Sequence, residues 1–181
     1  MQLKSLVDCR LKIGRYPTFY YNATGGGGIT TADYQDNKGN LFFRFNPNSF
    51  SIPSLNWQTT KFLGLVLLPG LEINIVPKII KGNINIHSGL VSLQLEAKFI
   101  LSIFSLIKAP ELVVKTELTS TNIKGDIHEA IGSPINNRGE TILVGLATIE
   151  PSGNRFLDSF LSLPNEALAI LHCEFTNFKT N

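Results

Sequence analysis

Charged residues are scarce in this chain, and so are long apolar runs. Only 17% of the 181 residues are Asp, Glu, Lys or Arg, and the formal net charge is +2. The 16 Lys and Arg residues are spread singly, whereas a nucleic-acid binder gathers them into a stripe, so we expect no nucleic-acid partner. No apolar run reaches the roughly 18 to 20 residues that a membrane-spanning helix requires.

Cysteine is nearly absent as well. Cys9 and Cys173 lie near opposite ends of the sequence. In a chain without a leader, such a pair is more often two buried thiols than a disulfide, which is the alternative. The first ten residues carry charges within their apolar part and lack a small-residue cleavage site, so we expect no signal peptide. We therefore expect a cytoplasmic protein that can also lie against a membrane from that side.

Side chains that carry chemistry are few and isolated. The three histidines, His87, His128 and His172, have no Cys or His partner at a metal-ligand spacing, so we expect no metal site. Asp126 and Glu129 flank His128, but this pattern is more typical of the polar face of a hairpin than of an acid–base pair. The Gly-x-Ser-x-Gly motif of serine hydrolases is absent. We expect a protein that is not an enzyme, with no catalytic residues and no cofactor.

Apolar residues, by contrast, are plentiful. They make up 43% of the chain, and the mean hydropathy is +0.12, so the chain is less charged and slightly more apolar than an average soluble domain. This excess has to lie in a thick core, in a ligand cavity, or on a surface that faces a partner or a membrane. The length predicts a single domain over residues 1–181, and the strand patterns described next predict that it is β-rich.

Residues 71–107 carry the clearest structural pattern. Apolar and polar side chains alternate over 71–75, 83–87 and 93–103, which predicts three consecutive β-strands that share one apolar face. That face must be buried against another layer. Alternation, aromatic content or flanking turn residues predict further strands over 3–13, 18–22, 30–34, 41–45, 111–118, 123–131, 141–149 and 167–176, with a helix as the alternative for the last.

One short helix is predicted near the C-terminus. Asn154 is a suitable N-cap, and Phe156, Leu157, Phe160 and Leu161 follow it as an apolar stripe. Together the patterns predict an all-β, mainly antiparallel fold: a meander-type β-barrel or a two-layer β-sandwich with one short C-terminal helix. We favour closure of the sheet, because a closed sheet leaves no exposed strand edges.

Two local features have a functional and a structural interpretation. Four glycines at 25–28 can cradle a phosphate, but neither a Gly-Lys-Ser/Thr ending nor a helix follows them, so we favour a flexible or bulged strand connection. Phe42, Phe43 and Phe45 surround Arg44, a composition also found in the stacking platforms of single-strand nucleic-acid binders. Consecutive strand residues point to opposite faces, however, so we expect these aromatic rings to pack in the core.

The leading functional hypothesis is non-enzymatic binding of an apolar or amphipathic small molecule, such as a lipid, an isoprenoid or a pigment. Small β-barrels fill with side chains, and slightly larger ones hold a ligand inside, which would account for the apolar excess. The predicted ligand-binding residues are those expected to face inward: Phe62, Leu65, Leu71, Ile73, Ile84, Leu95, Phe99 and Leu146.

The alternative hypothesis is an interaction or assembly protein. The run 62–70 is apolar without alternation until Pro69, so it is either buried on both faces or exposed to an apolar partner. In the second case it would dock on a membrane surface or a membrane-protein complex, or on a second copy of the chain. The predicted interaction residues are Phe62, Leu63, Leu65, Leu67 and Leu68.

Overall fold

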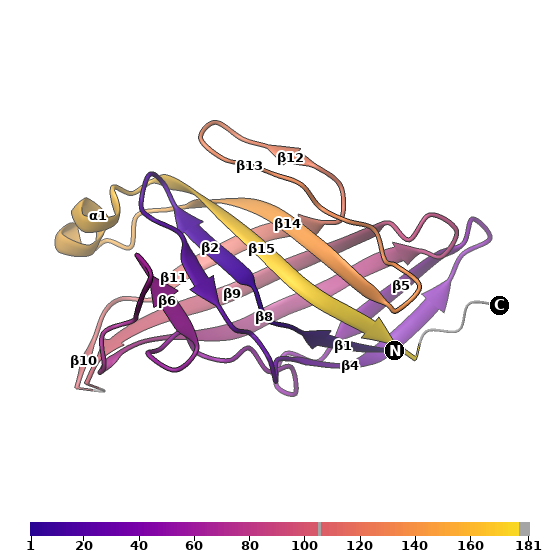
Figure 1. Cartoon of the computed structure of the whole chain (residues 1–181), viewed down its shortest axis with the longest axis horizontal. Coiled ribbons are helices and arrows are strands. Elements are labelled where there is room, and N and C mark those ends of the chain that lie inside the picture. Colours follow the sequence, from indigo (N-terminus) through magenta and orange to yellow (C-terminus); the bar gives the residue numbers. More distant parts are fainter. Residues whose placement is uncertain (105, 178–181) are drawn as a thin grey trace.

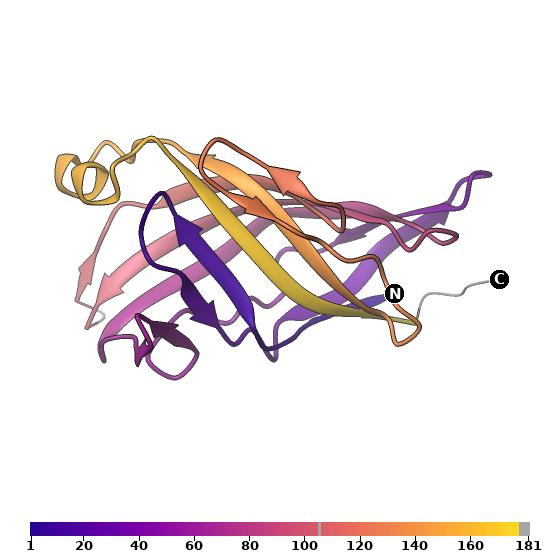
Figure 2. The same cartoon turned by 45° about the horizontal axis from the view of Figure 1, so that its top comes forward.

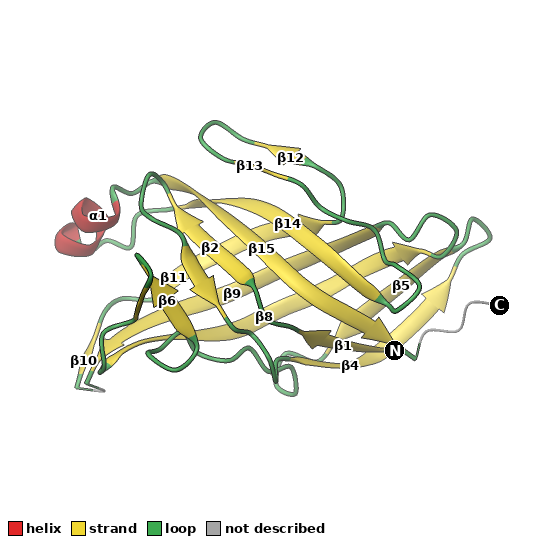
Figure 3. Cartoon of the chain, viewed as in Figure 1, coloured by secondary structure: helices red, strands yellow, loops and turns green. Residues whose placement is uncertain are grey.

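The computed structural model describes residues 1–104 and 106–177, so residue 105 of the predicted stretch 71–107 lies outside it. Strands follow one another along nearly the whole chain, with one short helix before the last strand (Figures 1 and 3). The elements are β1 (Gln2–Ser5), β2 (Cys9–Ile13), β3 (Phe19–Tyr21), β4 (Gly27–Gln35), β5 (Asn40–Phe45), β6 (Thr60–Phe62), β7 (Leu65–Val66), β8 (Leu71–Asn85), β9 (Val91–Ile103), β10 (Ile107–Lys108), β11 (Leu112–Thr119), β12 (Ile123–Lys124), β13 (Glu129–Ala130), β14 (Glu140–Ile149), α1 (Arg155–Leu161) and β15 (Asn165–Thr176).

Eight of these strands form a ring. Their order is β1, β4, β5, β8, β9, β11, β14 and β15, with every neighbouring pair antiparallel. The pairing of β1 with β15 closes the ring. The predicted all-β, antiparallel, meander-like fold with one short C-terminal helix is therefore confirmed, and closure by β15 settles the final segment as a strand and not a helix.

The last strand is long enough to pair with two partners on the same edge. Its second half pairs with β1 and its first half with β2, because the chain bends between those strands at Asp8, which has a φ of 63°. Beyond β2, the sheet continues through β3 and β6 to β7. These strands therefore extend the wall toward the end of the molecule where α1 lies (Figures 1 and 2).

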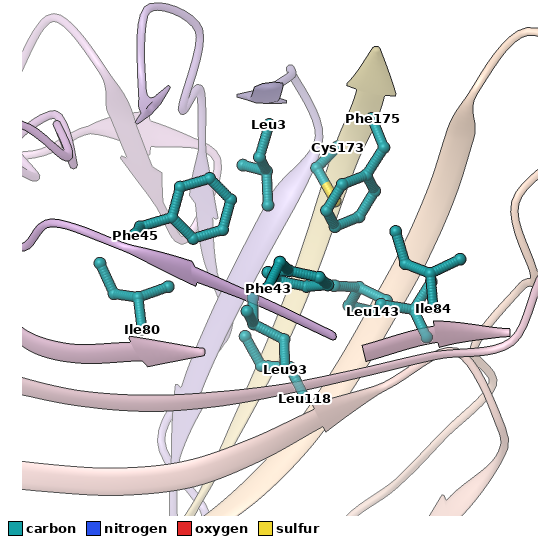
Figure 4. Close-up of a cluster of buried hydrophobic side chains, with 11 residues drawn as sticks. Leu3, Phe43, Phe45, Ile80, Ile84, Leu93, Leu118, Leu143, Cys173 and Phe175 are labelled. Carbon is teal, nitrogen blue, oxygen red and sulfur yellow. The ribbon is translucent and has the colours of Figure 1, made fainter. Parts of the chain in front are cut away.

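Two clusters of buried side chains fill the interior. The alternation of strand side chains places every second residue inside the ring, which is why the fully buried Ile84, Leu93 and Ala97 fall at apolar positions of the predicted pattern. Figure 4 shows the first cluster, and the second lies toward β2 and β3. The first comprises Leu3, Phe43, Phe45, Ile80, Ile84, Val91, Leu93, Leu118, Leu143, Cys173 and Phe175, and the second Cys9, Tyr21, Ala23, Leu55, Ile75 and Ala97.

The predicted core role of the aromatic residues near 42–45 is confirmed for two of them. Phe43 and Phe45 are buried and their rings meet edge-on, with centroids 5.5 Å apart. Phe42 lies on the other side of β5 and stacks on Tyr34. Both cysteines are buried and free.

Four predicted strand segments have different bounds in the structure. The segments 71–75 and 83–87 belong largely to one strand, β8, because a bulge between Pro77 and Ile79 shifts the pairing without ending it. The predicted strand 3–13 is divided at the bend into β1 and β2. The predicted strand 123–131 is a hairpin of two-residue strands, β12 and β13.

The four glycines at 25–28 lie where the connection from β3 enters β4: Gly25 and Gly26 belong to the connection, and Gly27 and Gly28 begin the strand. Gly27 has a φ of 117°, and any side chain there would collide with the backbone of Leu3 on β1. The glycines therefore allow two strands of the ring to approach each other closely.

Candidate functional site

Large apolar side chains are exposed together at one end of the ring. The β6–β7 turn, the segment between β9 and β10, and α1 all lie at this end, while the N-terminus lies toward the opposite end (Figures 1 and 2). Each of the three carries apolar side chains that are more than half exposed. We call this set the apolar tip: Leu63, Leu65, Val66, Leu68, Phe104, Leu106, Phe156 and Phe160.

The backbone at the tip is unfavourable for the residues that occupy it. Leu63 has a φ of 53° and Phe104 a φ of 50°. In this left-handed region an ordinary side chain costs about 1–2 kcal/mol, and glycine or asparagine is preferred. Both side chains are nonetheless 69% exposed. A large apolar residue at each position therefore serves neither the turn geometry nor the core.

The β6–β7 turn is a tight hairpin connection. β6 and β7 pair through Phe62 and Leu65, leaving Leu63 and Gly64 as the two turn residues, both with positive φ. Such turns favour Asn-Gly. With Leu in the first position, the hairpin directs apolar side chains away from the ring.

The helix α1 contributes to the tip because only one of its side chains, Leu157, is buried in the protein. The Asn154 side chain accepts a hydrogen bond from the Leu157 N–H at 3.0 Å, and Leu157 is buried. Phe156 and Phe160 are exposed and stack on each other with centroids 6.3 Å apart. The predicted apolar stripe is therefore divided between core and surface, since a helix of under two turns that meets the barrel at its rim buries only one side chain, Leu157.

A carboxylate fixes the segment that enters this helix. Asp158 accepts hydrogen bonds from the side-chain hydroxyl and backbone N–H of Ser152, at 2.6 and 2.7 Å, and from the N–H of Gly153. These bonds, the Ser152 hydroxyl first, hold the pKa of Asp158 below its usual value. Asp158 thus stays ionised and keeps α1 attached at the end of β14.

The predicted interaction residues divide between the tip and the wall. Leu63, Leu65 and Leu68 belong to the tip, with Leu65 73% exposed. Leu67 is buried, and the Phe62 ring stacks on Phe19 of β3 at 4.5 Å. The sequence reasoning missed the contributions of the β9–β10 segment and α1, whose apolar residues lie far from 62–70 along the chain.

The predicted ligand-binding residues do not line one common space. Ile73, Leu95 and Phe99 pack against the second core cluster, and Leu71 pairs with Ile103 near the tip. The remaining members lie elsewhere: Phe62 in the wall, Leu65 at the tip, Ile84 in the first core cluster, and Leu146 beneath the β12–β13 hairpin, where it approaches Gly125.

Comparisons with protein families, curated proteins and solved structures found no match for this chain. In the part of the chain that the structure describes, no helix has the length and apolar character needed to cross a membrane. Within residues 1–104 and 106–177, no group of three or more His, Cys, Asp or Glu side chains is arranged to hold a metal ion.

Proposed function

We propose that the protein is a peripheral membrane protein that docks on a lipid bilayer by inserting the apolar tip. The observation that carries this proposal is the pair Leu63 and Phe104. Each is a large, exposed, apolar residue held in a backbone conformation that disfavours it. Strain of this kind persists where it serves a function, and the property these two positions share is the outward projection of an apolar side chain.

A bilayer fits the tip better than a protein partner does. A protein interface needs a surface of matching shape, with a packed centre, whereas the tip consists of side chains that project from a hairpin, a loop and a short helix. Lipid chains adapt to such an uneven surface. Full burial of a Leu side chain is worth about 1.5–3 kcal/mol. Inserting the exposed parts of Leu63, Leu65 and Leu68 therefore gains roughly 3–6 kcal/mol before the cost of association.

A second candidate, binding of an apolar molecule inside the ring, is favoured by one observation. Ile73 and Leu101 are paired on the inner face of β8 and β9, and Leu71 lies on the same face of β8. All three are only partly buried, whereas Ile84 further along β8 is fully buried. The inner face is thus more accessible near the tip. Native mass spectrometry of the purified protein tests this candidate: a copurifying lipid or pigment would support it, and a ligand-free mass would count against it.

Vesicle cosedimentation of Leu65→Asp tests membrane docking. With vesicles of neutral phosphatidylcholine, we expect the native protein to sediment and the variant to bind at least about ten-fold more weakly. The variant loses an apolar contact and places a carboxylate at the lipid surface. Because Leu65 is 73% exposed, the variant should keep its fold, as circular dichroism would verify.

The matched control is Ile131→Asp. Ile131 is 75% exposed but lies after the β12–β13 hairpin, outside the tip, so this variant should sediment like the native protein. Native protein that stays in solution, or equal loss of binding in both variants, would contradict the proposal.

A further inference from the structure

A cavity of about 350 Å³ lies on the outer face of the wall, beneath the loop that joins β12 to β13. At its base β2 pairs with β15, with Arg10 opposite Ile170 and Lys12 opposite Leu168. Ala169, between the two β15 residues, packs against the first core cluster. Since strand side chains alternate, Arg10, Lys12, Leu168 and Ile170 point outward into the cavity. Figures 1 and 2 both show the β12–β13 hairpin alongside β14 and β15.

Glu166 of β15 holds the covering loop in place. Its carboxylate accepts hydrogen bonds from the backbone N–H groups of Asp126, Ile127 and His128 at 2.8, 3.1 and 2.7 Å. Burial tends to raise the pKa of Glu166, but these three donors outweigh burial and lower it below the usual value. The loop is therefore attached by an ionised carboxylate whose oxygens are already engaged by protein donors.

His128 lines this cavity and has an unsatisfied ring nitrogen. The residue is only 6% exposed, and among the described residues nothing forms a hydrogen bond with its buried Nε2. Buried polar atoms in folded proteins are nearly always paired, because leaving one unpaired is costly. A polar group bound in the cavity that His128 lines would pair this nitrogen once the ring turns toward it.

The charges and apolar surfaces of the lining define what that group is. Arg10 and Lys12 outnumber the one carboxylate of the lining, Glu129. The Arg10 guanidinium lies over the Tyr20 ring, 5.6 Å from its centroid, which restrains its orientation. Arg and Lys bind carboxylates and phosphates through strong charge-assisted hydrogen bonds. Beside them, Leu168 and Ile170 offer apolar contact.

We infer that this cavity binds a small amphipathic anion, with its carboxylate or phosphate group at Arg10, Lys12 and His128 and its short apolar part on Leu168 and Ile170. The volume is at the lower end of the roughly 300–1,000 Å³ that small-molecule sites occupy, which suits a short chain. The cavity lies outside the ring, so the inference does not depend on the proposed membrane docking.

Isothermal titration calorimetry with octanoate tests this inference. We expect saturable binding to the full chain, at least about ten-fold weaker in Arg10→Gln and in Lys12→Gln, because each variant removes a charge-assisted hydrogen bond. Both positions are on the outer face of β2, so the fold should tolerate the changes. The control Lys81→Gln removes an exposed cation from β8, and it should bind octanoate like the native protein.

Two further probes separate the anionic from the apolar contribution. Inorganic phosphate and neutral 1-octanol should each bind more weakly than octanoate. If phosphate binds as tightly as octanoate does, the cavity is a site for free anions. If octanol binds as tightly as octanoate does, the cavity is an apolar pocket. Either result overturns the inference, and so does a lack of octanoate binding. In ¹⁵N NMR spectra, the His128 Nε2 signal should move when octanoate is added. An unchanged signal would overturn the role given to His128.

Discussion

Replacing Leu63 by Asn should change two properties of the β6–β7 turn in opposite directions. Leu63 has a φ of 53°, where a leucine costs about 1–2 kcal/mol and an asparagine much less. The side chain is 69% exposed, so Asn sacrifices little packing. We expect a net stabilisation of about 0.5–1 kcal/mol, which raises Tm by about 1–4 °C in a chain of this size. Differential scanning calorimetry measures this shift.

The same substitution should weaken binding to vesicles. If the exposed part of Leu63 enters the bilayer, its loss costs about 1–2 kcal/mol, which corresponds to a five- to thirty-fold weaker association. A stability gain together with a binding loss is the behaviour expected of a residue kept for function at the expense of turn geometry. An ordinary loop position would not show this opposition.

Ser162→Asn is the matched control. Ser162 caps α1 with a φ of 53° and is exposed, so Asn relieves comparable strain without removing an apolar side chain from the tip. It should raise Tm and leave vesicle binding unchanged. An unchanged or lower Tm in Leu63→Asn would refute the argument from strain, and unchanged vesicle binding would refute the membrane role of this residue.

Two further predictions concern the wall of the ring. In Gly145→Val, the new Cβ would lie 2.7 Å from the Glu117 carbonyl oxygen, so overpacking should cost about 1–3 kcal/mol and lower Tm by about 2–12 °C, and an unchanged Tm would contradict this packing. In Glu166→Gln, the backbone amide hydrogens of residues 126–128 should exchange with solvent about five to thirty times faster. The neutral Gln side chain would replace the carboxylate that now accepts charge-assisted hydrogen bonds from these three N–H groups. Since the pKa of Glu166 is lowered, protection of these amides should be complete above the ordinary Glu pKa of about 4.3 and fall as the pH drops through the lower folded value. Hydrogen exchange followed by NMR checks both statements, and equal protection in the variant would exclude Glu166 as the anchor.

The sequence predicts the ring well wherever one face of a strand is buried. β9 shows why: its inner face is buried and it has neighbours on both sides, so the apolar period of two is visible along the chain. Gly145 of β14 is packed against β11, where an added Cβ would collide with Thr116 and Glu117. The pattern fails at β8, because a bulge changes which residues face inward without ending the strand.

The candidate sites are harder to predict because they are assembled from separate segments. The cavity joins Arg10 and Lys12 to His128 only through the pairing of β2 with β15 and the attachment of a loop by Glu166. None of these residues is unusual in its own segment. Sequence spacing therefore gave no signal for a site that depends on contacts between residues more than a hundred positions apart.

Many of the apolar residues that the core does not use lie at the tip. Single exposed apolar side chains are normal on a protein surface, and Ile29, Tyr34 and Ile131 are of this kind. The tip differs because its eight side chains come from three segments that all lie at one end of the ring. Only the run 62–68 is conspicuous in the sequence, while Phe104 and Phe156 are brought to the same end by the fold. If the excess of apolar residues served only the core, positions 63 and 104 would be free to carry polar turn residues. The positive φ angles of Leu63 and Phe104 favour such residues. The apolar side chains at these two positions are therefore the basis on which we propose contact with an apolar environment outside the protein.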